Sequence, residues 1–165
     1  MDALRAGRAL AGPAAALAWA AAAAAGLAVA GCVGSALAAG SPVPASAVPQ
    51  LTMIASRAAK ADGDPAPSQV TAVLTTHAKA LTSATPGDFV PGSGGVRVFL
   101  VTMRGHFVAY DASVPPGAAA PAGRYLSLVV DAKTFQVLDL GLGPKPPPVP
   151  PASLGPVTYL TVRPH

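Results

Sequence analysis

The chain has 165 residues, of which 52% are hydrophobic and 11% are charged, with a single Cys and a formal net charge of +4. This length accommodates one small domain, and one Cys excludes an internal disulfide and a zinc site of the usual Cys and His spacing. The cations beyond the N-terminus are scattered singly, whereas a nucleic-acid partner requires a basic stripe or patch. We therefore expect no nucleic-acid partner.

Residues 1–38 have the pattern of an export signal or a membrane anchor. Arg5 and Arg8 precede an uncharged apolar stretch at 9–30. At about 1.5 Å per residue this stretch is long enough to cross about 30 Å of hydrocarbon, although it consists mostly of Ala, which inserts less favourably than Leu or Ile. The positive-inside rule places the N-terminus in the cytoplasm and the chain after residue 38 outside the cell.

Three fates of this segment are compatible with the sequence. Residues 29–32 (VAGC) resemble the lipobox of bacterial lipoproteins, which makes Cys32 the candidate for lipid attachment. Residues 36–38 (ALA) have the small-x-small form of a signal-peptide cleavage site. In the third alternative the segment is an uncleaved transmembrane helix, and Cys32 is an ordinary buried thiol. The first and third alternatives predict a protein held at the cell membrane, and the second predicts a secreted one.

A Pro, Ala and Ser linker is expected at 39–50, followed by a helix. The segment 41–49 (SPVPASAVP) is too rich in Pro for a helix and favours an extended spacer. Apolar residues then recur at helical spacing from Leu51 to Ala59, and the turn at 62–65 (DGDP) ends the pattern. This pattern predicts a short amphipathic helix of about three turns.

The first two predicted strands lie on either side of a Gly- and Pro-rich interval at 85–95. Residues 69–81 suit either a helix or a strand, and their β-branched side chains favour a strand. Residues 96–103 (VRVFLVTM) are apolar on both faces, which is typical of a central strand. Gly105 interrupts this run and predicts a β-bulge.

The C-terminal third of the sequence predicts a hairpin and one further strand. Residues 125–130 and 136–142 flank the turn DAKTF and form the best hairpin signal in the chain. A polyproline segment at 144–151 separates this hairpin from an alternating strand at 157–162.

These elements together predict an α+β fold, in which one short amphipathic helix packs on an antiparallel sheet of about three to five strands. We expect the extracytoplasmic domain to cover 51–143. The polyproline segment follows at 144–151, and the terminal strand and tail follow at 152–165.

The residue types needed for catalysis or metal binding do not occur at the required spacing. Nucleophilic catalysis needs a Ser or Thr beside a His with an orienting carboxylate, and no G-x-S-x-G elbow frames any Ser. No two of the three His are at a metal-ligand spacing, and no Gly-rich segment completes a phosphate-binding or dinucleotide-binding motif. We therefore expect no catalytic residue, no metal site and no cofactor.

The segment Arg104-Gly105-His106-Phe107 is the one candidate for a partner contact. A polar ring beside a bulge can be aimed at a partner. We accordingly consider Arg104, His106 and Phe107 as candidate contact residues.

The order of features in 51–160 resembles small exported or membrane-anchored proteins of unknown function from high-GC Gram-positive bacteria. The clearest motifs are RGHF at 104–107 and VVDA at 129–132. The second motif also resembles the closing hairpin of PepSY-type domains, a strand-Asp-x-x-Thr-Gly-strand form, in which Gly stands where this chain has Phe135. The resemblance implies an extracytoplasmic inhibitory or binding module and no catalytic residue.

The sequence thus leads us to expect a membrane-anchored, extracytoplasmic module of the bacterial cell envelope that binds or modulates another component without catalysing a reaction. Its expected partner is the membrane, and another envelope protein is the second candidate. One alternative function is an envelope hydrolase that uses His106 with Asp131. The other is a structural protein that self-associates through an exposed strand edge at 157–162.

Overall fold

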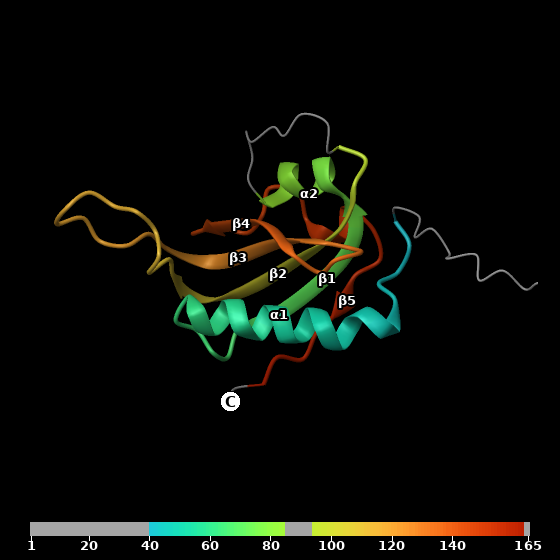
Figure 1. The fold of residues 1–165 in the computed structure, drawn as a ribbon, viewed down its shortest axis with the longest axis horizontal. Coiled ribbons are helices and arrows are strands. Elements are labelled where there is room, and N and C mark those ends of the chain that lie inside the picture. The colour runs from blue at the N-terminus through green and yellow to red at the C-terminus, as the bar shows by residue number, and fades with distance from the viewer. Residues whose placement is uncertain (1–39, 85–93, 164–165) are drawn as a thin grey trace, which may run out of the picture. The chain divides into compact units, whose positions relative to one another are not determined.

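The computed structural model describes residues 40–84 and 94–163, so the expected anchor at 1–38, with Cys32, lies outside the described residues. Within these ranges the chain forms a single sheet of five antiparallel strands in the order β4-β3-β2-β1-β5. One helix, α1, lies across one face of the sheet, and a second helix, α2, lies over the opposite face (Figure 1). The predicted α+β class is confirmed, and the sheet has the largest number of strands expected.

The elements are, in chain order, η1 (Ala45–Ala47), α1 (Val48–Ala61), β1 (Ser68–Thr76), α2 (His77–Ala84), β2 (Arg97–Val108), β3 (Ala122–Asp131), β4 (Val137–Gly143), η2 (Pro151–Ser153) and β5 (Thr158–Tyr159).

The domain begins earlier than the predicted linker allows. Val43 and Ala47 are buried in the main core, a 3-10 turn occupies 45–47, and α1 begins at Val48. Pro49 lies in the first turn of α1, where its missing N–H has no helical partner to lose and its fixed φ suits the helix. The prediction of an extended spacer at 41–49 is therefore wrong from residue 45 onwards, because Pro disfavours a helix interior but not a helix start.

The ambiguous segment 69–81 is divided between two elements. Its β-branched part forms β1, and α2 begins directly at His77. The prediction of a strand is correct up to Thr76 and wrong beyond it. The residues directly after Thr76 include good helix formers, and the helix that they form covers the second apolar face of the sheet. Ala80 of α2 packs there with Val73, Val98, Leu100 and Val129.

Three local predictions for the sheet are confirmed. Strand β2 is central, between β1 and β3. Its register with β3 shifts between Arg104 and Phe107, which is the bulge expected at Gly105. The β3–β4 hairpin also forms, and the N–H of Asp131 donates to the carbonyl of Gln136 at 2.8 Å.

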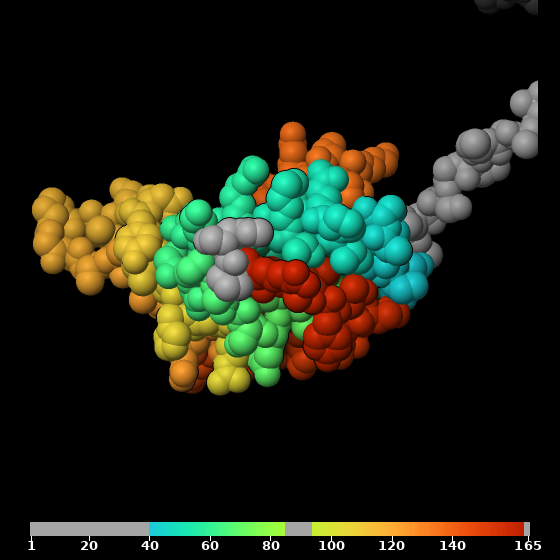
Figure 2. Space-filling view, turned by 90° about the horizontal axis from the view of Figure 1, so that it is seen from below, coloured from blue at the N-terminus to red at the C-terminus, as the bar shows by residue number. Residues whose placement is uncertain are grey.

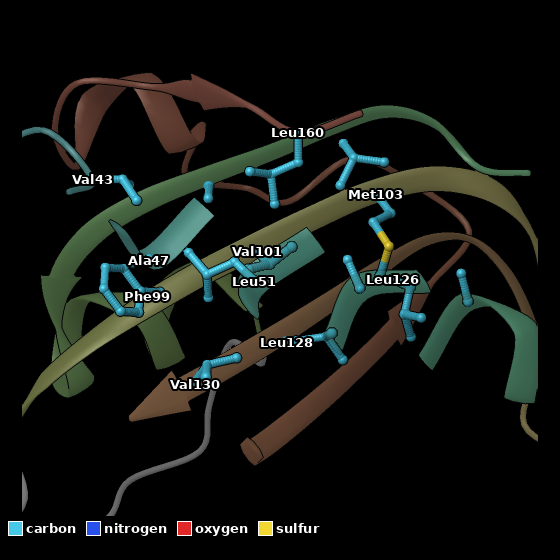
Figure 3. Packing of buried hydrophobic residues seen from close by; sticks show 14 of the residues in the cluster. Val43, Ala47, Leu51, Phe99, Val101, Met103, Leu126, Leu128, Val130 and Leu160 are labelled. Carbon is cyan, nitrogen blue, oxygen red and sulfur yellow. The ribbon is translucent and has the colours of Figure 1, made fainter. Parts of the chain in front are cut away.

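The main core lies between α1 and the sheet (Figure 3). Helix α1 contributes the buried stripe Leu51, Ala55 and Ala59. The central strands contribute large apolar side chains that alternate with those of the second face, among them Phe99, Val101, Met103, Leu126, Leu128 and Val130. This alternation explains why β2 is apolar on both faces, since each face is covered by a helix.

The Pro-rich segment connects the two edges of the sheet. It leaves β4 at one edge and reaches β5 at the other, a distance of four strand spacings or about 19 Å. It crosses the face that carries α2, since the hydroxyl of Ser83 donates to the carbonyl of Val149 at 2.7 Å, and Leu154 and Val157 pack against the apolar cluster beneath α2. An extended Pro-rich chain is suited to such a crossing because it needs no backbone hydrogen-bond partners of its own.

Candidate functional site

The segment Arg104-Gly105-His106-Phe107 is held in place by Asp64, in the connection between α1 and β1. The backbone N–H of His106 donates to Oδ2 of Asp64 at 2.8 Å, and the N–H of Ala66 donates to Oδ1 at 3.1 Å. A Cβ at residue 105 would collide with Oδ2 of Asp64 and come within 2.9 Å of the Phe107 ring. The absence of a side chain at Gly105 therefore allows the close approach of this carboxylate to the bulge.

The structure separates the three residues expected to contact a partner. The side chain of Phe107 is only 1% exposed and belongs to the main core, so its assignment as a contact residue is wrong. The bulge turns Phe107 inward and leaves its two polar neighbours outside. Arg104 and His106 are solvent-exposed and line an open, polar depression of about 290 Å³ together with Arg124, Ser68 and Asp64.

His106 and Asp131 lie at opposite ends of the β2–β3 pair. Asp131 is in register with Val98, eight residues before His106 along β2, a separation of about 26 Å at about 3.3 Å per residue. The carboxylate of Asp131 is engaged in its own turn, where Oδ1 accepts bonds from the N–H groups of Lys133 and Thr134 and from the Thr134 hydroxyl. The structure thus does not bring together the two groups on which the hydrolase alternative depends, because a general base must come within hydrogen-bond reach.

A pairing that sequence reasoning missed joins α2 to the edge strand β4. Nε2 of His77 lies 2.7 Å from Oδ2 of Asp139, and the His77 side chain is almost fully buried while that of Asp139 is about one-third exposed (6% and 31%). The two residues are 62 positions apart, so no local pattern indicates the contact. The contact joins the start of α2 to β4 on the face of the sheet that α2 covers.

A depression lies on the outer side of α1, between this helix and the C-terminal segment. We call it the α1 groove. Its volume is about 550 Å³, and it is lined by Pro49, Thr52, Met53, Ser56, Arg57, Lys60, Pro65, Thr161 and Arg163. The lining therefore contains three cations and no carboxylate.

The α1 groove was not predicted, although some of its signal is present in the sequence. The spacing of Met53, Arg57 and Lys60 places them on the side of α1 opposite its buried stripe. Arg163 reaches the same groove from a position more than 100 residues later. Only the return of the chain along α1 brings the third cation to this place.

Within the described residues there is no group of three or more His, Cys, Asp or Glu side chains that could hold a metal ion. Among the helices at 40–84 and 94–163, none is both long and apolar enough to cross a membrane. Cys32, the candidate for lipid attachment, lies outside these ranges. In comparisons with protein-family models, curated proteins and solved structures, the chain matches none of them.

Proposed function

We propose that this chain is a membrane-anchored, extracytoplasmic binding module of the bacterial cell envelope, and that its ligand site is the α1 groove. The α1 groove carries the proposal because it is a depression of about 550 Å³ that combines three cations with apolar side chains. Ligand sites are concave and combine an apolar lining with a few polar groups.

The sequence of the N-terminal segment supports the anchoring half of this proposal. Arg5 and Arg8 followed by the uncharged stretch 9–30 are typical of an export signal or anchor. The domain's first core side chain is Val43, only eleven residues after Cys32. A chain of eleven residues spans at most about 38 Å, so an anchored domain would be held close to the membrane surface.

The anchor is tested by the intact mass of the membrane-fraction protein, with wild type beside Cys32→Ala. A chain that begins at Cys32 with added acyl groups, and that is absent from the variant, supports a lipoprotein. An unprocessed chain in both samples supports a spanning helix. Recovery of a shortened chain from the medium alone would contradict anchoring.

The side of the membrane is tested by adding protease to intact spheroplasts. The proposal predicts that the protease degrades the domain at 43–163 while a cytoplasmic marker protein stays intact. Protection of the domain until the spheroplasts are lysed would contradict an extracytoplasmic location. Chemical crosslinking on the same cells tests for another envelope protein as a partner.

Self-association is a second candidate function, favoured by the edge strand β4. This strand has one neighbour in the sheet, and Val137, Leu138 and Leu140 on it are 46%, 43% and 47% exposed. The edge proposed from the sequence, at 157–162, contains only the two-residue strand β5. Strand β4 has seven residues and β5 has two, so β4 offers the longer edge for pairing with a second copy of the chain.

Sedimentation of the full chain in a neutral detergent at tens of micromolar tests this second candidate. If β4 mediates pairing, Leu140→Lys converts a dimer to a monomer, whereas Tyr159→Lys on β5 leaves the dimer intact. A wild-type chain that is monomeric under these conditions would rule the candidate out.

A further inference from the structure

Helix α1 has two chemically different sides. Its inner side, with Leu51, Ala55 and Ala59, is fully buried in the main core. Its outer side presents Met53, which is 52% exposed, and the exposed cations Arg57 and Lys60 one and two turns further along the helix. Residues at spacings of three and four lie next to each other on a helix surface, so these three side chains form one continuous strip.

The C-terminal segment runs beside this strip. Leu160 is buried, and its N–H donates to the carbonyl of Val70 at 2.9 Å, which fixes the segment against β1. Beyond Leu160 the chain continues along α1, where Thr161 and Arg163 form the second wall of the α1 groove. Figure 2 shows this C-terminal segment, in red, directly beside α1, in cyan to green.

The charge of the α1 groove is not compensated within the described residues of the chain. Arg57, Lys60 and Arg163 form no ion pair with another described residue, and the lining contains no Asp. Three like charges around one depression repel each other, and a bound anion reduces the free energy of this repulsion. Arg guanidinium groups and Lys ammonium groups are the side chains that bind phosphate most often.

We infer that the α1 groove binds the phosphate-bearing headgroup of an anionic membrane lipid. The cations supply the phosphate contacts, and Met53 and Pro49 supply apolar surface for the portion of the lipid next to the headgroup. A surface that combines basic and apolar side chains is typical of contact with anionic membranes. Free phosphate has no apolar part that could contact the apolar side chains. The inference rests on the proposed function, since an anchored domain meets lipid headgroups at high local concentration.

The test uses the full chain, labelled with ¹⁵N, in micelles of a short-chain phosphatidylcholine. Short-chain phosphatidylglycerol is added to one sample and glycerol phosphate, the corresponding soluble phosphate, to another. The side-chain Nε–H signals of Arg57 and Arg163 report directly on the α1 groove. We expect these signals to shift saturably with phosphatidylglycerol and to respond to glycerol phosphate at least about tenfold more weakly, because three charges near an anionic surface contribute jointly.

Two triple variants with the same change in net charge identify the site. Arg57→Gln with Lys60→Gln and Arg163→Gln removes the cations of the α1 groove. Lys79→Gln with Lys133→Gln and Lys145→Gln removes three exposed cations outside it. We expect the first variant to bind phosphatidylglycerol about tenfold more weakly and the second to bind like the wild type. Binding by both variants is followed from the backbone amide signals of residues 50–60, which remain when the Arg side-chain signals have been removed. An unchanged pattern of dispersed amide signals shows that each variant is folded.

Three results would overturn the inference: no shift at the α1 groove with phosphatidylglycerol, equal weakening by both triple variants, or saturation by glycerol phosphate as tight as by the lipid. The last result would assign the α1 groove to a soluble phosphate ligand. All of these measurements are independent of where the protein resides in a cell. If the lipid titration fails while the protease experiment shows an extracytoplasmic domain, only the lipid inference is overturned. If the domain is protected from protease in intact spheroplasts, the proposed function is overturned.

Discussion

The carboxylate of Asp64 accepts a hydrogen bond at 2.8 Å from the backbone N–H of His106, 42 residues away. This contact joins the connection after α1 to the bulge of β2. It gives a hydrogen-bond partner to a backbone donor within the bulge, where the register of β2 with β3 shifts. The RGHF segment thus has a structural role that is distinct from any contact made by Arg104 or His106.

We predict that Gly105→Ala destabilises the domain by about 1–3 kcal/mol, because the added Cβ must displace the Asp64 carboxylate or the Phe107 ring. Gly95→Ala is the matched control, since a Cβ at Gly95 meets nothing within 4 Å. Urea unfolding of both variants gives the comparison. Equal midpoints for the two variants would show that the bulge tolerates a side chain.

The contact between His77 and Asp139 predicts energetic coupling between α2 and β4. A double-mutant cycle with His77→Gln and Asp139→Asn should give a coupling free energy of about 0.5–1.5 kcal/mol, as expected for a partly buried polar pair. Additive effects of the two substitutions on the free energy of unfolding would show that the contact contributes nothing to stability.

Phe135 combines a backbone strain with an aromatic contact. Its φ is +58°, in the left-handed region that favours Gly, and its ring stacks on Phe99 with centroids 5.8 Å apart. Phe135→Ala loses the stacking and keeps the strained backbone, whereas Phe135→Gly loses the stacking and relieves the strain. We therefore expect the Gly variant to be about 1 kcal/mol more stable than the Ala variant, as measured by thermal unfolding. An Ala variant as stable as the Gly variant would show that the turn does not impose this conformation.

Asp131 predicts a pH dependence of stability. Hydrogen bonds from the N–H of Thr134 above all, and also from the N–H of Lys133 and the Thr134 hydroxyl, hold the pKa of its carboxyl below the usual value. The unfolded chain then binds a proton more readily than the folded one. The stabilisation is fully present above the unfolded pKa of about 3.9 and is lost as the pH falls towards the lower folded pKa. Asp131→Asn should therefore be less stable than wild type at neutral pH, and the difference should shrink below about pH 4.

Asp62 provides a control of opposite sign for this measurement. Burial raises the pKa of its carboxyl, and the charge of Asp111 raises it further. Ionised Asp62 is therefore unfavourable in the folded state, and Asp62→Asn should gain stability relative to wild type as the pH rises through the folded pKa. Unfolding curves recorded from pH 3 to pH 7 test both variants, and parallel curves for all three proteins would contradict both assignments.

Features that depend on local patterns could be predicted from the sequence alone. The continuous apolar run of β2, the turn at 131–135 between the hairpin strands and the bulge at Gly105 all follow from residues that are neighbours in the chain. The α+β class follows from them, because an amphipathic helix and half-buried strands must cover each other's apolar sides. The N-terminal export pattern is also local, and it stays a prediction because it lies outside the described residues.

Which residues share a surface, in contrast, depends on the tertiary structure. The burial of Phe107, the approach of Asp64 to Gly105 and the contact of His77 with Asp139 join segments up to 62 residues apart. The return of Arg163 beside Arg57 and Lys60 depends on the crossing of the Pro-rich segment from β4 to β5. Such contacts result from the packing of two helices on opposite faces of one sheet, and the spacing of residues along the chain carries no record of that packing.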